Sequence, residues 1–147
     1  MPLDPQASRP HMPGYGIADA GGGKGLLPWS WASERLEKAH NYFVSTTRPD
    51  GGPHTMPVWG VWLDQAFYFS TGRQSRKARN LVANPSCVVC PERGDEAVIV
   101  EGVAEEVTDP AVFRRFAEAY YKKYQWKVEP SQDPVYAVRP QMSKSAR

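Results

Sequence analysis

The stretch FYFSTGRQSRKARNL, residues 67–81, decides the expected fold. Its first three residues are aromatic and suit a half-buried strand. Ser70, Thr71 and Gly72 follow as a polar turn. Ser75 suits the N-cap of a helix, because its hydroxyl can accept a hydrogen bond from a free backbone N–H group of the first turn. The stretch therefore predicts a strand, a turn and a helix in immediate succession.

The first turn of this expected helix carries charges of the wrong sign. Arg76 and Lys77 lie there, with Arg79 close behind, although the N-terminal end of a helix dipole is positive and favours anions. Each such charge costs up to about 1 kcal/mol unless a negative group offsets it. A phosphate would do so, because helix N-termini bind anions through their backbone N–H groups. An exposed basic face is the alternative, but the neighbouring hydroxyls of Ser70 and Thr71 favour an anion site.

The composition indicates one ordinary globular domain. The chain has 147 residues, of which 41% are hydrophobic and 12% aromatic, enough for a single core. A net charge of +2 is too small to indicate nucleic acid or an anionic membrane as the main partner. No apolar run reaches the roughly 20 residues that a membrane span needs. The N-terminus lacks a basic and then apolar signal pattern, so we expect a cytoplasmic protein.

The two cysteines, Cys87 and Cys90, have C-x-x-C spacing. A redox-active pair of this kind needs its first cysteine at a helix N-terminus, whereas residues 86–91 read as a strand. Zinc would require two further ligands at suitable spacing, and none stands out. We therefore expect both cysteines to be reduced and structural.

Short strands and turns fill most of the chain. Pro57 places its strand at an edge or an irregular position, Gly102 indicates a bulge or a barrel corner, and residues 64–65 suit a tight hairpin. Ser30 and Asp109 are candidate helix caps. The expected strands are 41–47, 54–63, 66–69, 86–91, 96–107 and 135–138, and the expected helices are 30–39, 75–83 and 111–124.

Six short strands in antiparallel hairpins with a few helices indicate a small β-barrel with helical additions. Residues 1–25 are rich in Pro and Gly and predict a loosely attached arm. Residues 26–140 form the expected domain, and 141–147 read as a polar tail. No glycine-rich dinucleotide-binding or P-loop motif is present.

The order of motifs resembles the pyridoxamine 5′-phosphate oxidase-like superfamily of flavin and deazaflavin oxidoreductases. The resemblance rests on residues 45–47 (STT), 50–59 (DGGPHTMPVW), 67–71 (FYFST), 75–81 (SRKARNL) and 84–85 (NP), and it covers roughly residues 26 to 138. Residues 26–32 (LLPWSWA) and 53–62 (PHTMPVWGVW) resemble the actinobacterial branch, many of whose members use a deazaflavin.

This resemblance implies a mainly β fold with helices, a six-stranded antiparallel split β-barrel of Greek-key type. It also implies a homodimer with two cofactor sites at its interface. The cofactor would be FMN or an 8-hydroxy-5-deazaflavin (coenzyme F420), and the activity would be hydride transfer to a small organic substrate. The residues expected to bind pyridoxamine phosphate do not stand out, so we do not expect a true pyridoxamine phosphate oxidase.

The resemblance also implies which residues bind the cofactor. Those expected to bind its phosphate are Ser75, Arg76 and Lys77, with Ser70 and Thr71 near the phosphate and the ribityl chain. Those expected along the tricyclic ring are Met56, Pro57 and Val58.

Three further residues would border the substrate: His54, Trp59 and, across the interface, the partner subunit's Trp126. For each of them an ordinary role is the alternative, since aromatic residues often fill a core or an interface and His54 flanks a turn. No protein nucleophile or metal site is expected.

Two other functional classes stay open on the sequence. The same pocket could hold a flavin, haem or bilin for storage or sensing without turnover. The basic run 73–79 could bind nucleic acid, although phosphate-backbone binding draws on many cationic contacts. A deazaflavin adds an anionic tail, for which Arg73 and Arg79 are candidate partners.

Overall fold

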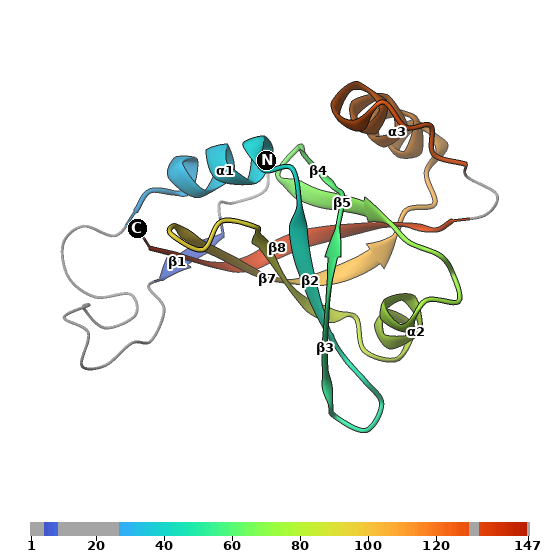
Figure 1. The fold of residues 1–147 in the computed structure, drawn as a ribbon, viewed down its shortest axis with the longest axis horizontal. Coiled ribbons are helices and arrows are strands. Elements are labelled where there is room, and N and C mark those ends of the chain that lie inside the picture. The colour runs from blue at the N-terminus through green and yellow to red at the C-terminus, as the bar shows by residue number, and fades with distance from the viewer. Residues whose placement is uncertain (1–4, 9–26, 130–132, 147) are drawn as a thin grey trace.

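The computed structural model describes residues 5–8, 27–129 and 133–146 and forms one sheet with three helices (Figure 1). Seven strands follow the order β3-β2-β6-β7-β8-β5-β4, and β1 pairs with β8. The β1–β8 pair is parallel, and the other pairs are antiparallel. The strands are β1 (Gln6–Ser8), β2 (Tyr42–Thr47), β3 (Pro53–Val58), β4 (Val61–Leu63), β5 (Ala66–Ser70), β6 (Ser86–Pro91), β7 (Ala97–Glu106) and β8 (Val135–Ala146). The helices are α1 (Trp29–Lys38), α2 (Arg76–Ala83) and α3 (Pro110–Tyr124).

The two ends of the sheet, β3 and β4, are consecutive in the chain. They are joined by Trp59 and Gly60, so the single strand predicted for 54–63 is wrong. The chain bends there because β3 pairs with β2 while β4 pairs with β5. The prediction that Pro57 lies at an edge is confirmed, since β3 ends the sheet. An edge strand tolerates proline because its missing N–H is not needed by a second neighbour.

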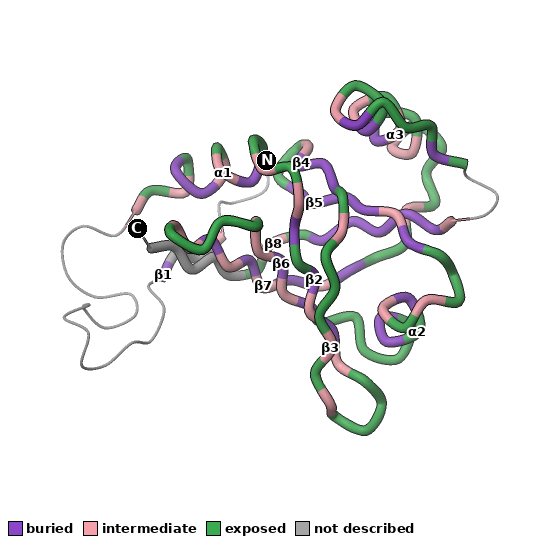
Figure 2. Tube along the Cα trace, viewed as in Figure 1, coloured by how far each residue is buried: buried purple, intermediate pink, exposed green. Residues whose placement is uncertain are grey.

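The helices cover both sides of the sheet. Trp31 and Leu36 of α1 and Leu81 of α2 belong to a core cluster that includes Phe67 and Phe69. Helix α3 packs on the opposite face of β4, β5 and β8, in a second cluster whose aromatic members are Tyr68, Phe116, Tyr120 and Tyr124. Strand β5 is thus buried on both faces. Each of the three helices also has exposed residues (Figure 2).

Both chain ends depart from the expected arm and tail. Residues 141–146 continue β8 and pair with β7, as far as Ala97 opposite Ala146. The reason is the length of β7, which has ten residues. Its first residues would have unpaired backbone groups if β8 ended at Val138. Pairing with them outweighs the weak strand preference of the polar residues that follow Val138. Residues 6–8 form β1 rather than a loose arm. Residues 1–4 and 9–25, the rest of the predicted arm, lie outside the described residues.

Several local predictions are confirmed. Ser75 and Asp109 cap α2 and α3 through their side chains. Asp64 and Gln65 have positive φ angles of 52° and 62°, as a two-residue hairpin turn requires. The β7–β8 register shifts at Gly102, where a Cβ atom would lie 2.6 Å from a backbone oxygen.

The predicted cap of α1 is wrong, because Ser30 lies inside the helix and Pro28 occupies the N-cap position without a side-chain hydrogen bond. Proline is suited to a helix start, where no N–H donor is needed.

The prediction for the cysteines is confirmed, since both are free. Cys87 faces the core and Cys90 the other side of β6. Burial raises the pKa of the Cys87 thiol to about 12 and also raises that of Cys90, which suppresses thiolate reactivity. None of the described helices is long and apolar enough to cross a membrane.

Candidate functional site

The turn between β5 and α2 is held by its own hydroxyl groups. Ser70 Oγ donates a hydrogen bond to the carbonyl of Pro134 (3.2 Å). The Thr71 and Ser75 hydroxyls are 3.0 Å apart, and Ser75 Oγ accepts from the N–H of Ala78 (3.2 Å). These contacts fix the start of α2, where the N–H groups of the first turn have no partner within the helix.

The cations at this helix start lack counter-charges. Arg76 is exposed and Lys77 is half-buried, and burial lowers the pKa of the Lys77 amine. Neither side chain forms an ion pair within the described ranges. Arg73, by contrast, pairs with Glu106 at 3.1 Å. Its charge is therefore already balanced, while Arg79 is exposed.

His54 belongs to the same region, although it was predicted to border the substrate. Asn80 of α2 donates to Thr46 Oγ1 of β2 (3.0 Å), and Thr46 lies directly opposite His54 of β3. Directly opposed residues share a face of the sheet. Burial lowers the pKa of His54, and the positive charges of Arg48, Lys77 and Arg76 lower it further.

These residues fit an anionic group. The Nδ1 atom of His54 is buried and lacks a hydrogen-bond partner in the described chain. A buried polar atom without a partner is uncommon and indicates a missing ligand or water. Arg48, Arg76 and Lys77 lie close enough to shift its pKa, and cations of this kind form strong charge-assisted hydrogen bonds with phosphate. The contribution of Arg48 was missed, because only the β2–β3 pairing brings that turn residue to α2.

The residues predicted to contact the ring lie on the edge strand β3. Met56 is 43% exposed and shares its face with His54 and Val58, because side chains alternate along a strand. Pro57 points to the other face, opposite Phe43. The free edge of β3 also presents unpaired backbone groups. A flat ligand laid on this edge would meet apolar side chains and backbone donors and acceptors.

Trp59 forms part of an aromatic cluster at the β3–β4 joint. Its ring stacks on Tyr124 with centroids 4.6 Å apart and planes 3° apart, and Tyr120 lies 6.4 Å away. An open pocket of about 400 Å³ adjoins the cluster. Its lining residues are Asn41, Pro57, Val58, Trp59 and Tyr120. Asn41 and Tyr120 were missed, since their sequence positions carry no sign of this proximity.

Trp126, the third predicted substrate residue, lies beyond the end of α3 and is 62% exposed. It is not a lining residue of the pocket beside Trp59. Its predicted role across a subunit interface stays a prediction.

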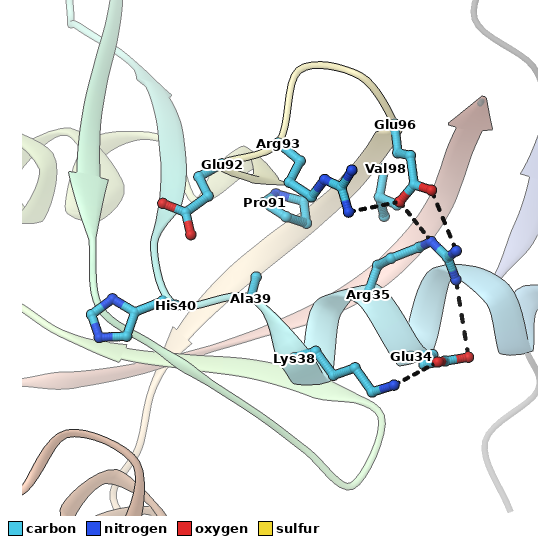
Figure 3. Close-up of a pocket in the computed structure, with 10 residues that line it drawn as sticks. All are labelled: Glu34, Arg35, Lys38, Ala39, His40, Pro91, Glu92, Arg93, Glu96 and Val98. Carbon is cyan, nitrogen blue, oxygen red and sulfur yellow. Dashed lines mark hydrogen bonds and ion pairs between the residues drawn. The ribbon is translucent and has the colours of Figure 1, made fainter.

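A larger hollow, of about 420 Å³, lies elsewhere, between α1 and the turn after β6 (Figure 3). None of the predicted site residues lines it. Arg35 pairs with Glu96 (3.0 Å) and Lys38 with Glu34 (2.7 Å). Three glutamates face two arginines and one lysine, with His40 beside them, so the formal charges of the lining balance when His40 is neutral.

Comparison with known proteins defines the class. The pattern of the family described as pyridoxamine 5′-phosphate oxidase matches residues 32–143, well over half of the chain, and the chain belongs to this family. No curated protein matches the chain.

Several solved structures share its fold. A conserved hypothetical protein from Mycobacterium tuberculosis is 21% identical, with a TM-score of 0.72 and coverage of 82% of this chain and 84% of the other. A protein described as an F420 reductase is 24% identical, with a TM-score of 0.62 and coverage of 76% and 94%. An FAD-binding protein from Mycobacterium smegmatis is 21% identical, with a TM-score of 0.67 and coverage of 82% and 95%. At these identities the likeness concerns the fold.

Proposed function

We propose that this chain is an oxidoreductase that binds FMN or an 8-hydroxy-5-deazaflavin and transfers hydride to a small organic substrate. The observation that carries the proposal is the group of cations around the buried Nδ1 of His54 at the start of α2, of which Arg76 and Lys77 form no ion pair with any described residue. Family membership supports the same site, because the α2 residues lie within the matched range.

The phosphate would be held by Arg76 and Lys77, with the N–H groups of the first turn of α2. Arg48 and His54 would add to this set. Ser70, Thr71 and the cap residue Ser75 would shape the turn around the phosphate and the ribityl chain.

The ring would lie along Met56, Pro57 and Val58, with the substrate near Trp59. The cofactor supplies the hydride chemistry, and the protein supplies binding, orientation and electrostatics. The structures described as an F420 reductase and an FAD-binding protein support testing both a deazaflavin and a flavin.

We propose further that the protein is a homodimer with its sites at the interface. The support is a largely apolar sheet face on one side of β2, β6 and β7, on which Ser45, Ser86 and Glu101 lie among Phe43, Val88, Cys90, Ile99 and Val103. These side chains are exposed or half-buried and belong to neither core cluster. The exposed face of an antiparallel sheet is normally polar, so a second copy of the chain is its proposed partner.

Fluorescence titration of the purified protein with FMN and with coenzyme F420 tests the proposal. We expect one of them to bind with a dissociation constant well below about 100 μM, or about −5.5 kcal/mol. The reduced complex is then mixed with electron-poor organic acceptors, and we expect faster reoxidation than in buffer. Binding without acceptor-dependent reoxidation would support a storage or sensing protein, and weaker binding of both cofactors would contradict the proposal.

A further inference from the structure

We propose that Lys123 is a positioning residue, whose amine fixes the Gly60 peptide and thereby the end of β3 on which the ring is proposed to lie. This inference rests on the proposed function. Lys123 belongs to the last turn of α3, outside every motif that pointed to the cofactor.

Both backbone polar groups of Gly60 form hydrogen bonds with α3. Its carbonyl accepts a hydrogen bond from Lys123 Nζ (3.0 Å), and its N–H donates to the phenol of Tyr124 (3.0 Å). The Lys123 amine also donates to the Tyr42 hydroxyl (2.9 Å). Gly60 itself is buried, so water cannot replace these bonds without entering the joint.

The Lys123 amine is needed because the Tyr124 phenol cannot donate to both of the carbonyls beside it. The Tyr124 oxygen lies 2.7 Å from the carbonyl of His40 and 2.8 Å from that of Gly60. A phenol has one proton, so it can donate to only one of these carbonyls. The amine supplies the second donor, and without it one of these two carbonyls would lose its partner, which is unfavourable for a buried acceptor.

The same contacts reach the two residues before Gly60. Tyr42, which accepts from Lys123, lies directly opposite Val58 in the β2–β3 ladder. The ring of Trp59 stacks on Tyr124. Lys123 and Tyr124 thus hold Gly60 directly. Tyr124 also stacks on Trp59, and Tyr42, which accepts from Lys123, pairs with Val58.

An amine at this depth is costly, which indicates a specific use. Burial lowers the pKa of Lys123 to about 8, and the charge of Glu92 offsets only part of this effect. The rings and phenols of Tyr42 and Tyr124 also face the amine, and the His40 ring packs on Tyr124. A methionine would fill similar space without the desolvation cost, but it would leave the joint without its donor.

The test compares Lys123→Met with the wild type and with Lys122→Met, a control at the neighbouring exposed lysine. Each protein is titrated with FMN and with riboflavin, which has the same ring but no phosphate, and the visible circular dichroism of the bound ring is recorded. We expect Lys123→Met to weaken both ligands by the same factor of about ten, ~1.4 kcal/mol, and to change the ring spectrum. If the protein binds the deazaflavin instead of FMN, the same comparison is made between coenzyme F420 and the deazaflavin that lacks its phosphate.

Lys123→Arg retains N–H donors and should restore part of the affinity. Should Lys123→Met fail to fold, Tyr124→Phe keeps the aromatic stack but removes the acceptor of the Gly60 N–H, and it should weaken both ligands in the same way. If these variants bind with wild-type affinity and show an unchanged ring spectrum, the inference about Lys123 is overturned, whether or not the variants are less stable. The proposed function would stand in that case. A wild type that binds none of these ligands would overturn the proposed function and this inference with it.

Discussion

The amine of Lys123 and the carbonyl of Gly60 lie 3.0 Å apart and join the last turn of α3 to the bend between β3 and β4. The bend separates the two ends of the sheet. A contact over 63 residues of sequence thus links α3 to the bend after the strand that borders the candidate site. Its consequences for stability can be measured without any ligand.

The stability conferred by Lys123 should depend on pH. Its pKa falls from 10.5 to about 8 on folding, so between pH 8 and 10.5 the unfolded chain binds more protons than the native protein, and stability rises with pH in that window. We expect the difference in unfolding free energy between the wild type and Lys123→Met to shift in favour of the wild type as pH rises from 7 to 10. Urea denaturation at several pH values measures this difference, in which the cysteine and tyrosine ionisations common to both proteins largely cancel. A difference that stays constant or shrinks would contradict the lowered pKa.

Replacing Gly60 by Ala should destabilise the joint. The new Cβ atom would lie 2.2 Å from Phe67 Cζ and 2.9 Å from the carbonyl oxygen of Tyr68, and Phe67 is fully buried and cannot move away freely. Overpacking of this kind costs about 1–3 kcal/mol, measurable by urea denaturation. Gly94→Ala is the matched control, because no atom lies within 4 Å of the added Cβ. Equal stability of the two variants would show that the joint has room for a methyl group.

Cofactor binding should be accompanied by proton uptake at His54. Burial, together with the cations Arg48, Lys77 and Arg76, keeps the pKa of His54 below its usual value in the free protein, so the imidazole is largely neutral at pH 7. A bound phosphate adds negative charge and raises that pKa, and we expect net proton uptake on binding near pH 7. Calorimetric titration with FMN in buffers of different ionisation enthalpy measures the uptake.

The control for this titration is His40→Gln, which changes an exposed histidine away from α2; because its ring lies against Trp59 and Tyr124, proton uptake is compared at saturating FMN. His54→Gln should lower the uptake, whereas His40→Gln should not. The FMN phosphate, whose second pKa is about 6, contributes to the titration in all three proteins, so the comparison is made at pH 8, where it is already ionised. The same uptake in His54→Gln and the wild type would exclude His54 from the phosphate site.

Replacing Phe43 by Lys should separate the proposed dimer. Phe43 is 40% exposed in the single chain, so a lysine there would not disturb the core, but in a dimer it would bury a charge in an apolar interface. We expect the dimer dissociation constant to rise by about 100-fold, ~2.7 kcal/mol, in sedimentation experiments. Val82→Lys changes a residue of α2 that is 83% exposed and should leave the dimer unchanged. A wild type that sediments as a monomer would contradict the proposal directly.

The sequence predicted those elements whose causes are local. The Ser75 and Asp109 caps, the hairpin at Asp64 and the bulge at Gly102 each follow from a few adjacent residues and agree with the structure. The extension of β8 was missed because its polar residues have weak strand preference and pair only through the length of β7.

The candidate site was predictable in part for the same reason. The charges at Arg76 and Lys77 conflict with the dipole of their own helix, which the sequence alone reveals. The proximity of Arg48 to α2 and the Lys123–Gly60 contact each depend on the packing of segments that are distant in sequence. Hydrophobic periodicity does not predict such packing. The resemblance to the family placed His54 at the substrate, and that role stays a prediction; its proximity to the α2 cations follows only from the β2–β3 pairing and the Asn80–Thr46 contact.

The central claim, that the start of α2 binds the cofactor phosphate, is tested most directly by titrating Lys77→Ala with FMN and with riboflavin. Lys77 is half-buried at that helix start and has no counter-charge in the described chain. We expect the affinity for FMN to fall at least about tenfold, ~1.4 kcal/mol, and the affinity for riboflavin to stay as in the wild type, with Lys122→Ala as the control. An unchanged dissociation constant for FMN, or an equal loss for riboflavin, would contradict the claim.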